Sequence, residues 1–169
     1  MKLILCRHGL AMDRAVSVTK KMEDNLRPLT DKGKKRSDLL AQSILNQNCD
    51  PNLLVSSPYV RAMQTAEILY QSFSTVEIHE CMDLVPSAPP QAFAQWLKKY
   101  AKSSTTIVAV GHEPQLSVFA SWVLAGLTES FIDLKKSGAL CLEFESFEDI
   151  YPRCATLKWA INPKSYLDK

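Results

Sequence analysis

Short apolar runs that alternate with longer, helix-like segments constrain the fold of this chain most. Each run is brief and is followed by polar or glycine-containing residues, as in the strands of a sheet. The runs lie at residues 2–6, 53–56, 76–79, 106–110, 139–144 and 154–159. Parallel strands need a crossover connection, usually a helix, so strands separated by helices predict an α/β domain. We expect a three-layer sandwich with a mostly parallel central sheet and helices on both faces.

Helix signals fall between these runs. Residues 32–45 predict a helix that is capped by Thr30 and turns Leu40, Ile44 and Leu45 inward. Residues 10–29 show no steady period, and we expect a long exposed loop there.

Further helices are expected after the second and fourth runs. Ser57 and Pro58 predict a helix start that runs to about residue 70, and Pro114 predicts a helix to about residue 124. A third helix carries apolar residues at i, i+3, i+4 and i+7, which indicates core packing. These residues are Phe93, Trp96, Leu97 and Tyr100.

Length and charge exclude several classes of protein. The chain has 169 residues, enough for one domain, which we place at residues 1–161 with a C-terminal tail at 162–169. Lys and Arg total 20 and Asp and Glu total 18, a formal charge of +2 that argues against a nucleic-acid partner. The apolar runs are too short for a membrane span or a secretory signal. We therefore expect no membrane association and a cytoplasmic location.

Three polar segments directly follow predicted strands. They cover residues 7–9 (Arg-His-Gly), 56–61 (Ser-Ser-Pro-Tyr-Val-Arg) and 111–114 (Gly-His-Glu-Pro). The carboxyl ends of parallel strands meet at one edge of a sheet, so Arg7, His8, Arg61 and His112 can converge there. Such a cluster needs an anion, and phosphate suits it because arginine forks bind phosphate oxygens in a bidentate way.

The absence of several motifs reduces the number of candidate nucleophiles for phosphate chemistry. The five cysteines, at positions 6, 49, 81, 141 and 154, form no C-x-x-C pair, and none has an arginine six residues later. We interpret them as buried, reduced thiols. The chain also lacks an Asp-x-Asp loop, a nucleotide-binding Gly-x-x-x-x-Gly-Lys loop and clusters suited to two metals. A histidine held neutral and oriented is the remaining candidate.

The three segments, in this order, resemble the signature of the histidine phosphatase (phosphoglycerate-mutase-like) superfamily. Residues 7–9 are similar to its RHG motif, residues 56–66 to its second block and residues 111–114 to its third. Residues 27–30 (Arg-Pro-Leu-Thr) match another common segment.

The resemblance implies a role for each pocket residue. His8 would take the phosphoryl group and form a phosphohistidine. Arg7, Arg61 and His112 would hold the phosphate oxygens and stabilise the transition state. Water would then release phosphate, and neither a metal nor an organic cofactor is implied.

Within this superfamily the chain resembles the small SixA-type phosphohistidine phosphatases. Only a short connection separates the third strand from the helix that begins before Phe93, and residues 137–140 (Ser-Gly-Ala-Leu) also fit that branch. The resemblance implies an open pocket that admits a phosphohistidine on another protein. A histidine phosphotransfer domain or a phosphocarrier would be such a partner, and we expect a monomer.

The general acid is the least defined part of the site. Asp83 matches the pattern of the small branch better than Glu80. The reaction can also proceed without either carboxylate as a general acid. The P–N bond of phosphohistidine is more labile than a P–O ester bond, so its cleavage needs less help from an acid.

Two other functions remain open. One is a phosphomonoesterase or mutase that acts on small esters such as sugar phosphates. The other is a non-catalytic phosphate-binding interaction module, against which the presence of all four pocket residues argues.

Some residues have a functional and a structural interpretation. Ser57 and Arg27 are candidates for phosphate binding, but Ser57 can instead cap a helix and Arg27 can form a surface salt bridge. Lys135 and Lys136 are interpreted as a solvated turn that could also meet an acidic partner.

Overall fold

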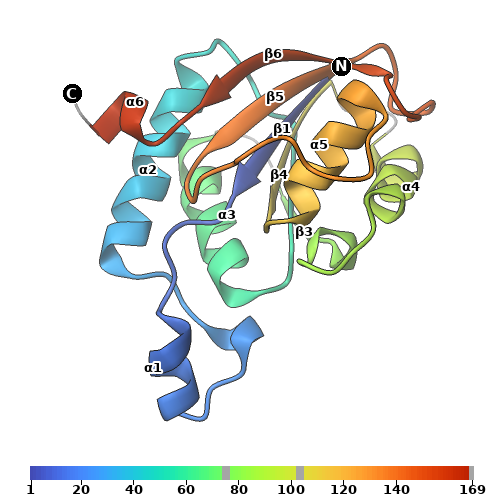
Figure 1. Ribbon diagram of the computed structural model, residues 1–169. Coiled ribbons are helices and arrows are strands. Elements are labelled where there is room, and N and C mark those ends of the chain that lie inside the picture. Colours follow the sequence, from blue (N-terminus) through green and yellow to red (C-terminus); the bar gives the residue numbers. More distant parts are fainter. Residues whose placement is uncertain (74–76, 102–104, 168–169) are drawn as a thin grey trace.

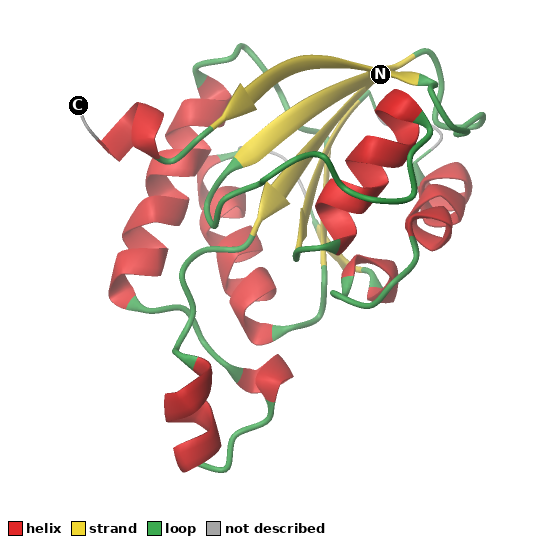
Figure 2. Cartoon of the chain, viewed as in Figure 1, coloured by secondary structure: helices red, strands yellow, loops and turns green. Residues whose placement is uncertain are grey.

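The described part of the chain forms a six-stranded sheet, shown in yellow in Figure 2. The computed structural model describes residues 1–73, 77–101 and 105–167. The strands are β1 (Lys2–Arg7), β2 (Leu53–Ser56), β3 (Ile78–Glu80), β4 (Thr106–Gly111), β5 (Ala139–Phe144) and β6 (Ala155–Ile161). Their order is β3-β2-β4-β1-β5-β6, and only β5 runs antiparallel to its neighbours. The predicted mostly parallel sheet is confirmed, although residue 76 of the expected third strand lies outside the described residues.

Helices cover both faces of the sheet, as the sequence predicts. They are α1 (Arg14–Thr19), α2 (Asp31–Leu45), α3 (Val60–Ser72), α4 (Pro90–Tyr100), α5 (Gln115–Ala125) and α6 (Lys164–Leu167), with the 3-10 turns η1 (Asp24–Leu26) and η2 (Met82–Leu84). In Figure 1, α2 and α3 lie on one side of the sheet, and α4 and α5 lie on the other.

Successive side chains of β1 enter two different cores because they point to opposite faces of the sheet. Leu5 belongs to the core that contains Phe93 of α4 and Phe119 of α5. Cys6 belongs to the core that contains Leu40 of α2. The central strands are therefore buried on both sides, which holds the carboxyl ends of β1, β2 and β4 in fixed register.

The helix over residues 31–45 begins as predicted. The Thr30 side chain accepts a hydrogen bond from the Gly33 N–H at 3.0 Å, the arrangement of an N-cap. Leu40 and Ile44 are fully buried, but the prediction that Leu45 points inward was wrong, because its exposed fraction is 40%. Each residue turns by about 100° around a helix axis, so the neighbour of Ile44 leaves the buried stripe.

The aromatic stripe of α4 is likewise only partly buried. Phe93 and Leu97 are completely enclosed and Trp96 packs against the same core. Tyr100, at the end of the helix, is 56% exposed, so core packing describes the stripe only up to its last turn.

Residues 10–29 are not the exposed loop that the sequence suggested. They contain α1 and η1, and an antiparallel bridge between Ala11 and Leu29 closes the segment at its base. Figure 1 shows α1 projecting beyond the arrowhead of β1. The hydrophobic pattern of the sequence did not indicate this helix, because α1 is short and its apolar residues face outward; Val18 is 73% exposed. We call residues 12–27 the α1 segment.

Helix α6 lies against α2. The Tyr166 hydroxyl of α6 donates a hydrogen bond to the Ser137 carbonyl at 2.6 Å. The five cysteines are free thiols, of which only Cys154 is partly exposed. Among the residues described here, no helix is both long and apolar enough to cross a membrane.

Gly33 lets the chain after β1 pass close to the first turn of α2. A Cβ at this position would lie 2.1 Å from the Leu10 carbonyl oxygen. The same carbonyl accepts a hydrogen bond from the Thr30 N–H at 2.9 Å. The backbone that leaves His8 is therefore held against α2.

We predict that Gly33→Ala lowers the free energy of unfolding by about 1–3 kcal/mol, the usual cost of overpacking. Helix propensity alone predicts the opposite sign, because alanine favours a helix over glycine by about 1 kcal/mol. Urea unfolding measures the difference, with Lys35→Ala on the exposed face of α2 as the control. A more stable Gly33→Ala protein would contradict the close approach.

Candidate active site

The ends of three parallel strands bring the polar segments of the sequence together. Arg7, the last residue of β1, pairs with Gly111 of β4. Beyond the strands, the His8 N–H donates to the Gly111 carbonyl at 3.1 Å, and the Ser57 N–H donates to the Val110 carbonyl at 2.9 Å. The backbone hydrogen bonds thus continue past the sheet edge and fix the start of each loop.

His8 lies at the centre of this arrangement and is 6% exposed. Its Nδ1 lies 2.7 Å from the Gly9 carbonyl oxygen. A carbonyl only accepts hydrogen bonds, so Nδ1 carries the proton and Nε2 keeps its lone pair. Arg61 Nε donates to that Nε2 at 3.3 Å. The His8 ring is therefore oriented with the Nε2 lone pair facing Arg61.

Burial keeps His8 neutral. Its pKa is lowered to about 3, mainly by desolvation; the hydrogen bond to Gly9 acts in the opposite direction, and the positive charges of Arg61, Arg7 and Lys136 add to the lowering. A neutral imidazole is the form of histidine that can act as a nucleophile.

His112 lies beside His8, with 4.8 Å between the ring centroids. Burial, followed by the charges of nearby cationic groups, lowers its pKa to about 2. Its Nε2 is 2.9 Å from Ser57 Oγ, while its Nδ1 is buried without a hydrogen-bond partner among the described residues. Ser57 is thus not the cap of α3, whose N-cap is Tyr59, and it contacts His112 instead.

These residues surround a cavity of about 600 Å³, which we call the central pocket. Positively charged groups dominate its wall. The lining residues are Arg7, His8, Leu10, Ala11, Met12, Asp13, Arg14, Arg27, Thr30, Arg61, Pro86, His112, Glu113 and Lys136. All four residues that the sequence singled out first, and also Arg27, therefore face one space, whereas Ser57 and Asp83 are not among its lining residues.

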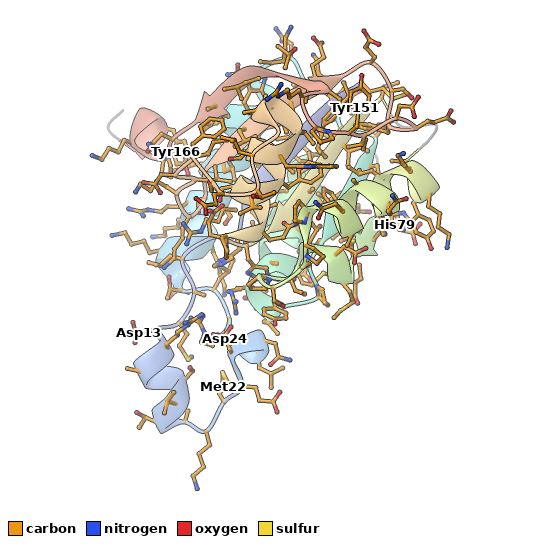
Figure 3. The ribbon with its side chains drawn as sticks, turned by 45° about the vertical axis from the view of Figure 1, so that its right-hand side comes forward. Asp13, Met22, Asp24, His79, Tyr151 and Tyr166 are labelled. Carbon is orange, nitrogen blue, oxygen red and sulfur yellow. The ribbon has the colours of Figure 1, made fainter. Side chains whose placement is uncertain are left out.

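Asp24 is the most important residue that sequence reasoning missed. Its Oδ2 accepts a hydrogen bond from Arg61 Nη2 at 3.0 Å, and its Oδ1 lies 2.9 Å from Arg27 Nη2 and 3.2 Å from Arg14 Nε. Burial alone would raise the pKa of Asp24, but the charges and hydrogen bonds of Arg61 and Arg27 lower it. Figure 3 shows Asp24 where the α1 segment meets the body of the domain.

The carboxylates near the pocket differ from the predicted general acid. Asp83 lies half-buried in η2, and Glu80 is exposed at the end of β3. Glu113 lines the pocket instead, and burial raises its pKa although the Ser117 hydroxyl donates a hydrogen bond to it. Its position directly after His112 was the available signal.

The chemistry of this pocket suits an anion rather than a metal. No group of three or more His, Cys, Asp or Glu side chains suited to a metal ion occurs among the described residues. Arginine and histidine side chains instead offer several N–H donors to one small space.

Comparison with known proteins agrees with this geometry. A model of the histidine phosphatase superfamily, branch 1, matches residues 3–85. The chain belongs to this superfamily. An uncharacterized protein of Picosynechococcus sp. is 36% identical over 143 residues, which are 84% of each chain.

Solved structures place this histidine phosphatase domain in a well-populated fold. The protein histidine phosphatase SixA in complex with tungstate matches with a TM-score of 0.82 and 21% identity, over 98% of this chain and 99% of SixA. Phosphoserine phosphatase from Entamoeba histolytica, bound to phosphoserine, matches with a TM-score of 0.70 and 16% identity, over 98% and 99% of the two chains. The fold is shared, and superfamily membership supports a phosphatase activity.

We predict that Asp24→Asn tightens the binding of inorganic phosphate about two- to fivefold, because a partly exposed ion pair of roughly 0.5–1 kcal/mol no longer competes for Arg61. Calorimetric titration measures the dissociation constant. Glu23→Gln removes the same charge from the exposed neighbouring residue and serves as the control. Weaker phosphate binding by Asp24→Asn would mean that the carboxylate orients Arg61 for its ligand.

The two buried histidines make stability depend on pH. Both have pKa values below the ordinary 6.5 in the folded protein, so the unfolded chain binds more protons as the pH falls from 6.5 toward 3. The free energy of unfolding should therefore decrease on acidification, by about 1.4 kcal/mol per pH unit for each histidine.

His112→Gln should remove part of this slope in urea unfolding at pH values from 4 to 7. His79→Gln removes an exposed histidine outside the pocket and serves as the control. The same slope in His112→Gln and in the unmodified protein would contradict the assignment of a neutral buried imidazole.

Proposed function

We propose that this protein is a metal-independent phosphatase in which His8 forms a phosphohistidine intermediate, and that its substrate is phosphohistidine on another protein. One observation carries the proposal. The Nδ1 proton of His8 is fixed by the Gly9 carbonyl, which leaves a neutral Nε2 lone pair facing a pocket of guanidinium groups. A nucleophile and a phosphate-binding surface therefore occupy the same space.

In the first step, the Nε2 lone pair of His8 attacks phosphorus while the P–N bond of the substrate breaks. The leaving imidazole departs as a neutral ring when its other nitrogen carries a proton. Positive charge develops on the His8 ring, and the Gly9 carbonyl stabilises it through the Nδ1 proton. In the second step, water attacks phosphorus, the bond to Nε2 breaks, and His8 is restored as phosphate and a proton are released.

Arg7, Arg61 and His112 are proposed to hold the phosphoryl oxygens during both steps. Arg61 Nη2 donates to Asp24 in this structure, so a phosphate bound by the same guanidinium group would compete with that contact. The SixA structure of the same fold contains tungstate, a tetrahedral oxyanion like phosphate, which supports this role for the pocket. Guanidinium groups supply the stabilising charge, so the proposed steps use no metal ion.

A protein substrate is supported by the connection between β3 and α4. In this part of the chain only η2 and a short loop, residues 81–89, join the two elements. No inserted subdomain lies there to cover the pocket, which leaves room for a histidine on a protein surface. A histidine phosphotransfer domain or a phosphocarrier has the required chemistry.

A small phosphate ester is the second candidate substrate, and Glu113 is the observation that favours it. An ester has a poor leaving group and needs a proton donor. Glu113 lines the pocket and burial raises its pKa, so it meets the requirement better than Asp83, which is not among the lining residues. Phosphohistidine needs neither carboxylate.

The test follows phosphate release from a histidine-phosphorylated protein and from a panel of small esters, with a chelator present. His8→Ala should slow release from phosphohistidine by at least about a thousandfold, since loss of a nucleophile removes the covalent route. Equal activity in His8→Ala and the unmodified protein would overturn the mechanism. Faster hydrolysis of an ester than of phosphohistidine would mean that the substrate is a small ester.

Two carboxylate variants test whether the reaction needs a general acid. Asp83→Asn and Glu113→Gln should each leave phosphohistidine hydrolysis within about threefold of the unmodified protein, because the leaving imidazole needs no acid. Ester hydrolysis should fall only in Glu113→Gln. A loss in Asp83→Asn as large as that in His8→Ala would contradict this account of the leaving group.

A further inference from the structure

A second cavity of about 480 Å³ adjoins the central pocket, and we call it the side pocket. Arg7 and Lys136 line both cavities. The two cavities therefore lie on either side of these shared side chains. The residues of the side pocket are Arg7, Arg36, Lys135, Lys136, Asn162, Pro163 and Lys164.

Three distant parts of the chain build this cavity. Arg36 comes from α2, Lys135 and Lys136 from the turn before β5, and Lys164 from the start of α6. Tyr166 holds the C-terminal part against the turn through its hydrogen bond to the Ser137 carbonyl. Figure 1 shows α6 beside α2, where this connection is made, and Figure 3 labels Tyr166.

The side pocket is strongly cationic. Five of its lining residues are arginine or lysine, and none is a carboxylate. Asp133, outside the lining, forms an ion pair with Lys135. Burial lowers the pKa of Lys136, and the neighbouring charges of Arg7, Arg27 and Arg61 lower it further, so these cations are not fully compensated.

Two buried donors in this wall also lack partners. The Nε atoms of Arg7 and Arg36 are inaccessible to solvent and have no hydrogen-bond partner in the described part of the chain. The Arg7 side chain donates a hydrogen bond from Nη1 to the Leu134 carbonyl at 2.7 Å. Neither Nε atom is accessible from the cavity, so the observation that favours a bound anion is the cationic lining itself.

We propose that the side pocket binds a carboxylate of an Asp or Glu side chain that lies near the phosphorylated histidine of the protein substrate. This inference rests on the proposed function. A phosphoryl group and a carboxylate would then be bound on opposite sides of Arg7. Recognition of the second anion selects acidic surfaces, while the chemistry remains in the central pocket.

The occupant is taken to be a protein side chain because the outer wall is exposed. The Lys135 side chain is 56% exposed and Lys164 is also exposed, so the cavity opens to the surface on the side of α6. A flexible lysine at such a rim suits an acidic partner surface and makes binding sensitive to salt. A small ester with its own carboxylate is the competing occupant.

The first arm of the test measures binding without catalysis. Tetraglutamate is titrated into the isotope-labelled protein in the presence of saturating inorganic phosphate, which fills the central pocket. Amide chemical shifts of residues 135–137 and of Asn162 and Lys164 should move, and they should not move in Lys164→Glu. Shifts that are absent, or that are confined to the central pocket, would overturn the proposal.

The second arm compares kcat/KM for a histidine-phosphorylated protein with kcat/KM for phosphoramidate, which has no carboxylate. Lys164→Glu should lower this ratio about fivefold or more through KM, because a rim charge acts on association. Lys99→Glu is the matched control, since it reverses an exposed charge on α4, on the opposite face of the sheet (Figure 1). An unchanged ratio in Lys164→Glu would overturn the proposal.

Two further results separate the alternatives. If Lys164→Glu affects phosphoserine relative to phenyl phosphate but leaves the protein substrate unchanged, the side pocket serves small esters and the inference is wrong. If the unmodified protein does not hydrolyse phosphohistidine at all, the proposed function fails, while the tetraglutamate titration still decides whether the side pocket binds carboxylates.

Discussion

The central constraint on this structure is that several guanidinium groups surround two neutral imidazoles in one partly buried pocket. Like charges repel and burial removes their hydration, so the arrangement needs a rigid support and a counter-charge. The support is the parallel sheet, whose backbone hydrogen bonds continue past β1 and β4 to His8 and fix its position. Asp24 supplies a counter-charge through its contacts with Arg61 and Arg27.

This counter-charge links the α1 segment to the site. Asp24 belongs to η1, and the segment around it is closed at its base by the Ala11–Leu29 bridge. Under the proposed function, its contact with Arg61 would compete with phosphate for the same guanidinium group. The α1 segment borders the central pocket through Arg14, and Val18 is an exposed apolar residue of the same helix.

The sequence predicted those features that depend on short-range patterns. The strands and main helices followed from brief apolar runs, helical spacing and the Thr30 cap, and the three polar blocks identified His8, Arg7, Arg61 and His112. The α1 segment was missed because a short helix with outward apolar residues has no buried stripe. Ser57 precedes a proline and looked like a cap, but contact with His112 decided its role.

The sequence by itself determined the fold class, the superfamily and the chemical types at the carboxyl ends of the strands. Those properties are local, because strand, loop and motif are contiguous in the chain. Only the tertiary structure decided the places of the carboxylates: Asp24 contacts Arg61, Glu113 lines the central pocket, and Asp83 does not line it. It also assembled the side pocket from α2, the turn before β5 and α6. Contacts between such distant segments arise from packing, which no local pattern records.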